Sequence, residues 1–395
     1  MKPNEGFIAR MRDAVAILQT EGPMAATQAI QKALSGATAA EAHKAPEASP
    51  WQGEWNLNDV SDMTLNEDSP AVAEAKAALD QTARSAAQDS SAATSSTGQR
   101  RGQFITASCS NRAGTRSYKV YIPSCYTTGL ALPLVVMLHG CKQNPDDFAA
   151  GTGMNQLAEE QRCVIVYPAQ AKRANGSNCW NWFRPGDQQR DRGEPSLIAD
   201  ITREVLERYG LDRTRCYIAG LSAGGAMAAI MGANYPDLYA AVGIHSGLPT
   251  GAAHNVPSAF AAMKKASNAH GAGKSQTPAI VFHGDRDATV HPLNGQQVVN
   301  QHAPAPAGLN RAADAASTVR QGRKPQGRAY TVTLRQDANG KTVTEHWVVH
   351  GAGHAWAGGS PKGSYTDPSG PDASREMLRF FYEHSLADEK HSAAA

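Results

Sequence analysis

The segment that most restricts the fold of this chain is the pentapeptide GLSAG at residues 220–224, which joins a strand pattern to a helix pattern. The apolar strand pattern lies directly before it, at residues 216–219, and the helix pattern begins at Ala223. A G-x-S-x-G turn in this context holds the serine side chain above the end of a sheet, and its glycines let neighbouring backbone pass closely. We therefore predict that Ser222 is a nucleophile. The alternative is a chance turn of glycine and serine.

Short apolar runs separated by helical patterns follow one another through the C-terminal part of the chain. Apolar runs that alternate with helices are typical of a mostly parallel sheet covered by helices on both faces. A hairpin is expected after them, because two further strand patterns flank the turn DANG. The expected strands are 117–122, 134–138, 164–167, 216–219, 241–244, 279–282, 330–335 and 342–349, and the clearest helices are 196–209 and 223–234.

Composition divides the chain into four parts. Residues 1–40 hold two stretches with apolar residues at helical spacing, which predict a helical hairpin. Residues 41–103 are rich in Ala, Ser, Thr, Asp and Gln and predict a low-complexity linker. The α/β domain is expected over 104–387, followed by a disordered tail at 388–395. Inside the domain, residues 301–328 lose the apolar period and predict a flexible or partly helical excursion.

His354 is the predicted base. It lies in the glycine-flanked segment GAGHAW, residues 351–356, which follows the last expected strand. A serine hydroxyl is a weak nucleophile until a base removes its proton, and small neighbours would let this imidazole reach Ser222. The alternative, a surface histidine, suits most of the other histidines better than this one.

Two carboxylates compete for the role of the acid that orients the imidazole. Both lie in the segment HGDRDATV, residues 283–290, after an expected strand. We predict that Asp287 is the acid, because its place in the loop turns it back toward the top of the sheet, where it would stabilise the protonated base. Asp285 is expected to brace the turn or to pair with Arg286.

Two backbone amides are the predicted donors to an oxyanion. The amide of Ala223 follows the nucleophile, and the amide of Cys141 follows the expected strand at 134–138. Donors in these two places stabilise the negative charge that develops when an acyl group is attacked, and each typically contributes on the order of 3 kcal/mol.

Three tryptophans are candidates for substrate contact. Trp180 and Trp182 lie in the loop NCWNWF, residues 178–183, which would suit a hydrophobic cleft for a polymer chain. Trp356, beside the predicted base, would wall off part of the pocket. For Trp180 and Trp182, a role in covering the core remains an equal alternative.

Charge and cysteine content exclude several other classes of function. The net charge is +2, with acidic and basic residues scattered, so nucleic acid is not an expected partner. No apolar run is long enough for a transmembrane segment, and the N-terminus shows no conventional secretory signal. The 6 cysteines lack metal-binding spacing, so a structural zinc is not expected. If the protein is exported, either Cys109 with Cys125 or Cys141 with Cys179 is a possible disulfide.

Several motifs together resemble the polyhydroxybutyrate depolymerase family of esterases, which also includes feruloyl and acetylxylan esterases. The resemblance covers residues 114–381 and implies an α/β-hydrolase fold, a triad of Ser222, Asp287 and His354, and an oxyanion hole of the Cys141 and Ala223 amides. It also implies an ester substrate and an acyl-enzyme, without a cofactor. The motifs are LHGCKQ (138–143), CWNW (179–182), GLSAGG (220–225), HSGL (245–248), HGDRD (283–287), GHAW (353–356) and GSYTD (363–367).

These features lead us to expect a serine esterase acting on short-chain polyhydroxyalkanoate, such as poly-3-hydroxybutyrate, or on its oligomers. Forms of the family without a signal resemble intracellular depolymerases, so a cytoplasmic location is expected, with residues 1–40 as a contact to storage granules. Packing of these helices on the chain's own domain and export by another route are the alternatives. Two other functions remain open: a feruloyl or acetylxylan type of esterase, and a non-catalytic granule-binding protein that keeps a hydrolase shell.

Overall fold

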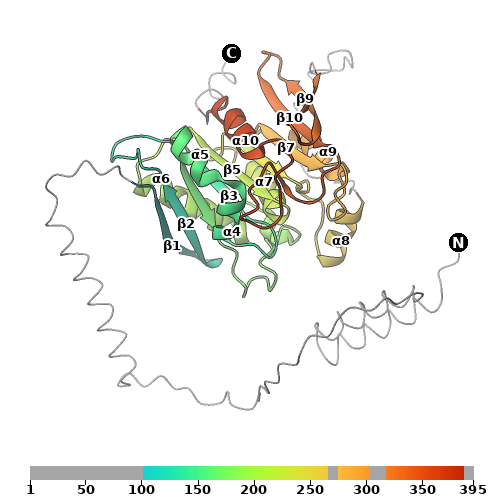
Figure 1. Ribbon diagram of the computed structural model, residues 1–395. Helices are drawn as coiled ribbons and strands as arrows, with labels where there is room; N and C mark the ends of the chain where they lie inside the picture. Colours follow the sequence, from blue (N-terminus) through green and yellow to red (C-terminus); the bar gives the residue numbers. More distant parts are fainter. Residues whose placement is uncertain (1–100, 266–274, 303–316, 387–395) are drawn as a thin grey trace, which may run out of the picture. The chain divides into compact units, whose positions relative to one another are not determined.

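A 10-stranded sheet forms the centre of the domain in the computed structural model, which describes residues 101–265, 275–302 and 317–386 (Figure 1). The predicted hairpin at 1–40, almost all of the linker at 41–103 and the tail at 388–395 lie outside the described residues. The sheet has the order β1-β2-β4-β3-β5-β6-β7-β10-β9-β8. Its strands are β1 (Gln103–Asn111), β2 (Gly114–Ile122), β3 (Leu134–Leu138), β4 (Val164–Pro168), β5 (Cys216–Leu221), β6 (Ala241–His245), β7 (Ala279–Gly284), β8 (Ser317–Arg323), β9 (Ala329–Gln336) and β10 (Thr342–Val349).

The middle of the sheet is parallel and its two edges are antiparallel. Strands β4, β3, β5, β6, β7 and β10 all run in the same direction. The pairs at the edges are antiparallel. Strands β3 and β4 are buried at every position, because helices cover both faces of the parallel part. The predicted mostly parallel sheet is therefore confirmed.

Helices cover each face of the sheet and create two hydrophobic cores. One core lies beneath α6 (Gly193–Arg208), α7 (Ala223–Asn234), α8 (Val256–Lys264) and α9 (Leu293–His302). The other lies beneath α4 (Pro145–Thr152), α5 (Met154–Gln161) and α10 (Ala373–Tyr382). Helix α7 packs closely because it is rich in small residues: a β-carbon at Gly232 would lie 2.6 Å from Val242 Cγ1. In the described ranges, no helix has the length and apolar character needed to cross a bilayer.

The predicted excursion at residues 301–328 is wrong for its described C-terminal part. Residues Ser317–Arg323 form β8, which pairs antiparallel with β9 at the edge of the sheet. Almost every residue of this strand is exposed. Because β8 is held by backbone pairing and buries no face, it has no apolar alternation from which it could be recognised.

Candidate active site

Ser222 occupies a strained turn between β5 and α7. Its φ of 57° and ψ of −118° are unusual for a residue other than glycine. The turn is held from below, because the Ser222 N–H donates to the carbonyl oxygen of His245 at 2.9 Å. It is also crowded from the side: a β-carbon at Gly224 would lie 2.1 Å from the carbonyl oxygen of Leu138. This packing explains why the turn needs glycine at 224 and presents the serine at the end of the sheet.

Asp287 and His354 meet across the ends of two neighbouring parallel strands. Asp287 follows β7 and His354 follows β10. The His354 Nδ1 atom lies 2.7 Å from Asp287 Oδ2, and these side chains are 11% and 0% exposed. The other carboxylate oxygen accepts the backbone N–H groups of Thr289 and Val290 at 2.9 and 2.8 Å. Asp287 is thus fixed on one side by its own loop and aimed at the imidazole on the other.

The surroundings of Asp287 keep its carboxyl group ionised. Burial opposes the charge, but hydrogen bonds from His283, His354 and the Val290 N–H outweigh it and hold the pKa of Asp287 well below its usual range. A buried carboxylate in this state stabilises a positive charge on the adjacent imidazole. The arrangement therefore suits a histidine that accepts a proton.

The loop after β3 passes directly over the serine turn. A β-carbon at Gly140 would lie 3.6 Å from the β-carbon of Ser222. The Gly140 carbonyl accepts hydrogen bonds from His139 Nδ1 at 2.8 Å and from the Gln143 N–H at 3.2 Å. Because the C=O and N–H of a trans peptide point in opposite directions, the Cys141 N–H points away from these donors. Among the described residues, neither the Cys141 nor the Ala223 N–H has a hydrogen-bond partner, so both are free to donate.

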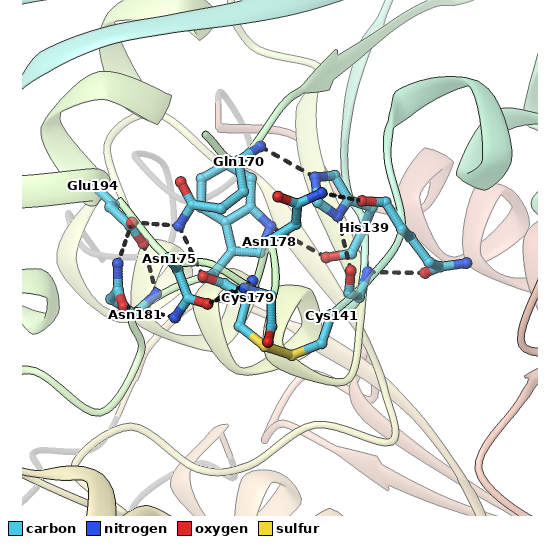
Figure 2. The surroundings of a disulfide bond; sticks show 12 residues. His139, Cys141, Gln170, Asn175, Asn178, Cys179, Asn181 and Glu194 are labelled. Atoms are coloured by element: carbon cyan, nitrogen blue, oxygen red, sulfur yellow. Dashed lines mark hydrogen bonds between the residues drawn. A yellow bond between two sulfur atoms is a disulfide. The ribbon is translucent and has the colours of Figure 1, made fainter. Parts of the chain in front are cut away.

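A disulfide joins Cys141 to Cys179, so the loop that carries one free amide is covalently tied to the segment after β4 (Figure 2). This is one of the two pairs that the sequence left open. The other two cysteines of that expectation, Cys109 and Cys125, are free thiols.

The segment on the Cys179 side is anchored by a buried carboxylate, Glu194, at the start of α6 (Figure 2). Both the backbone N–H and the Nδ2 of Asn181 donate to Glu194 at 2.7 Å. Gln170 Nε2 also donates to Glu194, and to the carbonyl oxygen of Cys179 at 2.8 Å. The disulfide therefore connects the Cys141 loop to a firmly held part of the domain.

The three tryptophans proposed for substrate contact are buried. Trp180, Trp182 and Trp356 are 0%, 6% and 1% exposed. Trp180 donates its indole N–H to the His139 carbonyl at 3.1 Å, and the Trp356 ring stacks on His245 with centroids 5.1 Å apart. Trp180 packs in the core beneath α6 to α9, and Trp356 packs in the core beneath α4, α5 and α10, so neither ring is exposed for the substrate contact predicted for it. For Trp180, this is the alternative role in covering the core. A substrate contact of Trp182 stays a prediction.

Two buried histidines support the site and were not predicted to do so. His245 accepts the Ala357 N–H at 2.9 Å, and burial lowers its pKa to about 3. His139 accepts the Gln170 N–H at 3.1 Å, and burial lowers its pKa to about 4. Both side chains are therefore neutral near pH 7. The signals in the sequence were their position at the carboxyl ends of parallel strands and their place in the motifs LHGCKQ and HSGL.

Comparison with known proteins agrees with this geometry. The family model described as Esterase PHB depolymerase matches residues 116–326, more than half of the chain. Poly(3-hydroxyalkanoate) depolymerase C of Paucimonas lemoignei is 32% identical over 235 residues, covering 56% of this chain and 54% of that protein. Poly(3-hydroxybutyrate) depolymerase of Ralstonia pickettii is 29% identical over 245 residues, covering 58% and 48%. The chain thus spans about half the length of these curated relatives.

Among solved structures, an acetyl xylan esterase from Aspergillus awamori superposes with a TM-score of 0.52 at 17% identity, covering 71% of this chain and 99% of that one. At this identity the likeness concerns the fold alone. Together with the strand order and the family match, it confirms the predicted α/β-hydrolase fold. The chain belongs to the Esterase PHB depolymerase family.

Proposed function

We propose that this domain is a serine esterase that hydrolyses the ester bonds of poly-3-hydroxybutyrate or its oligomers. The observation that carries the proposal is the 2.7 Å contact between Asp287 and His354, at the edge of the sheet where the parallel strand β5 also ends in the Ser222 turn. The two depolymerases named above support the choice of a polyester over other esters.

In the proposed reaction, Ser222 Oγ attacks the ester carbonyl carbon while His354 takes the hydroxyl proton. Asp287 stabilises the imidazolium that forms. The negative oxygen of the tetrahedral intermediate accepts hydrogen bonds from the Cys141 and Ala223 amides. The intermediate collapses to an acyl-enzyme, and His354 gives its proton to the leaving alcohol. His354 then deprotonates a water molecule, which releases the acid and restores Ser222.

The test is release of soluble 3-hydroxybutyrate and its oligomers from amorphous polyhydroxybutyrate granules by the full chain. Ser222→Ala is the matched variant, and p-nitrophenyl butyrate is the small-ester substrate. The proposal requires that both activities are present in the wild type and lost in Ser222→Ala. Cleavage of p-nitrophenyl butyrate without attack on granules would contradict the polyester part alone.

A carbohydrate esterase is the second candidate, because feruloyl esterase B of Neurospora crassa is 31% identical over 147 residues, covering 37% of this chain and 48% of that protein. Release of acetate or ferulate from plant polysaccharide, with no 3-hydroxybutyrate released from granules, would establish it. A non-catalytic granule-binding protein would instead leave Ser222 unlabelled by a fluorophosphonate probe.

The location of the protein is a separate proposal. The Cys141–Cys179 disulfide favours an oxidising compartment, because thiols in a reducing cytosol are kept reduced. The cytoplasmic location expected from the sequence, with residues 1–40 as a granule contact, is the competing proposal. Trapping of thiols during cell fractionation decides between them: a Cys141 that is alkylated at once in freshly lysed cells supports the cytoplasm. Granule sedimentation with and without residues 1–40 tests the contact.

A further inference from the structure

We propose that Asp285 is a positioning residue for the catalytic histidine: its carboxylate fastens the turn that carries His354 to the turn that carries Asp287. The activity part of this inference rests on the proposed function. Its starting point is the register of β7 and β10, in which Gly284 pairs with Val349. The two turns therefore begin at the same level, and the distance between acid and base depends on how these turns are held together.

Asp285 accepts two hydrogen bonds from the opposite turn. Its Oδ1 accepts the backbone N–H of Gly351 at 2.6 Å, and its Oδ2 lies 2.9 Å from His350 Nδ1. A backbone bond lies beside them, from the Arg286 N–H to the Ala352 carbonyl at 3.0 Å. The carboxylate is thus the one side chain of its turn that holds both the backbone and the side chain of the segment leading to His354.

Gly351 is held from its other side as well. Arg328 Nη1 donates to the Gly351 carbonyl at 2.7 Å, and Arg328 is itself paired with Asp367. Gly351 has a φ of +73°, a conformation that favours glycine. Both polar groups of this residue are therefore bonded to charged side chains, three positions before the base.

His350 extends the connection to β9. Its Nε2 lies 2.9 Å from the Thr331 hydroxyl, while its Nδ1 faces Asp285. Carboxylate, imidazole and hydroxyl stand in the same order as in the catalytic triad. The Asp285 and His350 side chains are 37% and 43% exposed, however, against 0% and 11% for Asp287 and His354. Because Asp285 and His350 are this exposed to solvent, we assign them the role of holding the turn before His354 in place.

Because Asp285 and His350 are exposed to solvent, the effect of Asp285 on the position of His354 can be tested without unfolding the domain. A solvent-exposed carboxylate–imidazole pair contributes little to overall stability. A small displacement of a catalytic group, in contrast, strongly reduces the rate. Loss of Asp285 should therefore leave the domain folded and the substrate bound, while the His354 imidazole moves relative to Asp287 and Ser222.

The test compares Asp285→Ala with Asp337→Ala in the full chain. Asp337 is the matched control, because its carboxylate also caps a turn, accepting the Asn339 and Lys341 N–H groups at 2.9 Å before β10 begins. For p-nitrophenyl butyrate we expect Asp285→Ala to lower kcat about tenfold with KM changed less than about twofold. Asp285→Asn keeps an acceptor for the Gly351 N–H, and we expect it to recover most of kcat. Asp337→Ala should keep the wild-type kcat.

A second measurement does not depend on activity. A proton shared between His354 Nδ1 and Asp287 gives a strongly deshielded ¹H NMR signal, which we expect to shift or broaden in Asp285→Ala and to stay in place in Asp337→Ala. A wild-type kcat and an unchanged signal in Asp285→Ala would overturn the inference. If Asp285→Ala does not fold, Asp285→Ser takes its place, because its shorter side chain cannot reach both Gly351 and His350. A wild-type kcat and an unchanged signal in Asp285→Ser would overturn the inference too. Absence of esterase activity in the wild type would refute the proposed function and leave the NMR test standing.

Discussion

Asp285 and Asp287 are two positions apart in one loop, yet their surroundings give the two carboxylates different chemistry. Asp287 is fully buried and contacts His354, whereas Asp285 is about one-third exposed and contacts His350 and Gly351. The pattern HGxxDxxV indicated which of the two would turn inward. It did not indicate the partner of Asp285, because that partner follows β10 and is brought close only by the pairing of β7 with β10.

Replacement of the buried carboxylate tests its role directly. We expect Asp287→Asn to lower kcat about 10³- to 10⁴-fold, because the amide neither orients the imidazole nor stabilises its positive charge. Since the pKa of Asp287 lies well below its usual range, the fall of kcat/KM in mild acid should not arise from this group. Stopped-flow and steady-state rates with p-nitrophenyl butyrate from pH 5 to 9 provide the measurement. A loss of less than tenfold would contradict the role of Asp287 as the acid.

The tryptophans mark the limit of prediction at this scale. The loop NCWNWF, which contains Trp180, predicts a cleft lining and a cover of the core equally well, and the segment GAGHAW places Trp356 beside the predicted base. In the folded chain, Trp180 and Trp356 are covered by other segments and bond to groups far away in the sequence, His139 and Ser374. Burial of a loop side chain depends on such long-range packing, which a local pattern does not contain.

At the scale of the elements, apolar runs predicted the interior strands well and the edge strands poorly. The bounds of β3 and β10 agree with the predicted ranges, and helix α7 agrees at both ends. Strand β8 was not foreseen, because its side chains are exposed and it is defined by backbone pairing with β9. Interior strands are specified by their own residues, whereas this edge strand is specified by its neighbour.

The close packing of α7 against β3 predicts a severe effect of one added methyl group. A β-carbon at Gly224 would lie 2.1 and 2.6 Å from the carbonyl oxygens of Leu138 and His139, and backbone on both sides leaves no room to adjust. We expect Gly224→Ala to destabilise the domain by about 3 kcal/mol or more. Gly176→Ala is the control, since nothing lies within 4 Å of its added β-carbon. Urea unfolding of both variants measures the difference in their free energies of unfolding. Equal midpoints would show that the turn between β5 and α7 tolerates an alanine at position 224.

The disulfide predicts a second effect at this scale. Cys179→Ala breaks the link to the Cys141 loop but leaves the Cys141 backbone amide in place. We expect kcat to fall about tenfold, because a donor that is free to move stabilises the oxyanion less well. Cys141→Ala and the double variant Cys141→Ala/Cys179→Ala should show the same loss as Cys179→Ala, since each of the three variants lacks the Cys141–Cys179 disulfide. Cys125→Ala, which removes a free thiol, is the control. Unequal losses in the two single variants would show that the bond itself is not responsible.

For the whole molecule, the buried histidines predict sensitivity to acid. Burial lowers the pKa of His139, His302 and His346 to about 4 and that of His245 to about 3. The unfolded chain takes up these protons near pH 6.5, so the free energy of unfolding should begin to fall below that pH and continue to fall until about pH 4. Each imidazole contributes at most about 3 kcal/mol to this fall.

Urea unfolding of the wild type at several values between pH 7.5 and 4 provides the measurement. His302→Gln is the informative variant, because His302 lies in α9 and, within the described part of the chain, its side chain bonds only to the Thr277 carbonyl, at 2.7 Å. Its free energy of unfolding should depend less steeply on pH than that of the wild type. A stability that is constant from pH 7 to 4 would be incompatible with neutral buried imidazoles.

The position of β8 at the end of the sheet also bears on self-association. Among the described residues, no strand pairs with the outer side of β8, so its backbone could in principle receive a strand from another molecule. Arg320 and Arg323 lie on this exposed strand, and a second copy aligned edge to edge would place like charges close together. Charge repulsion between Arg320 and Arg323 of two copies should therefore disfavour edge-to-edge pairing through β8 and the aggregation that such pairing would start.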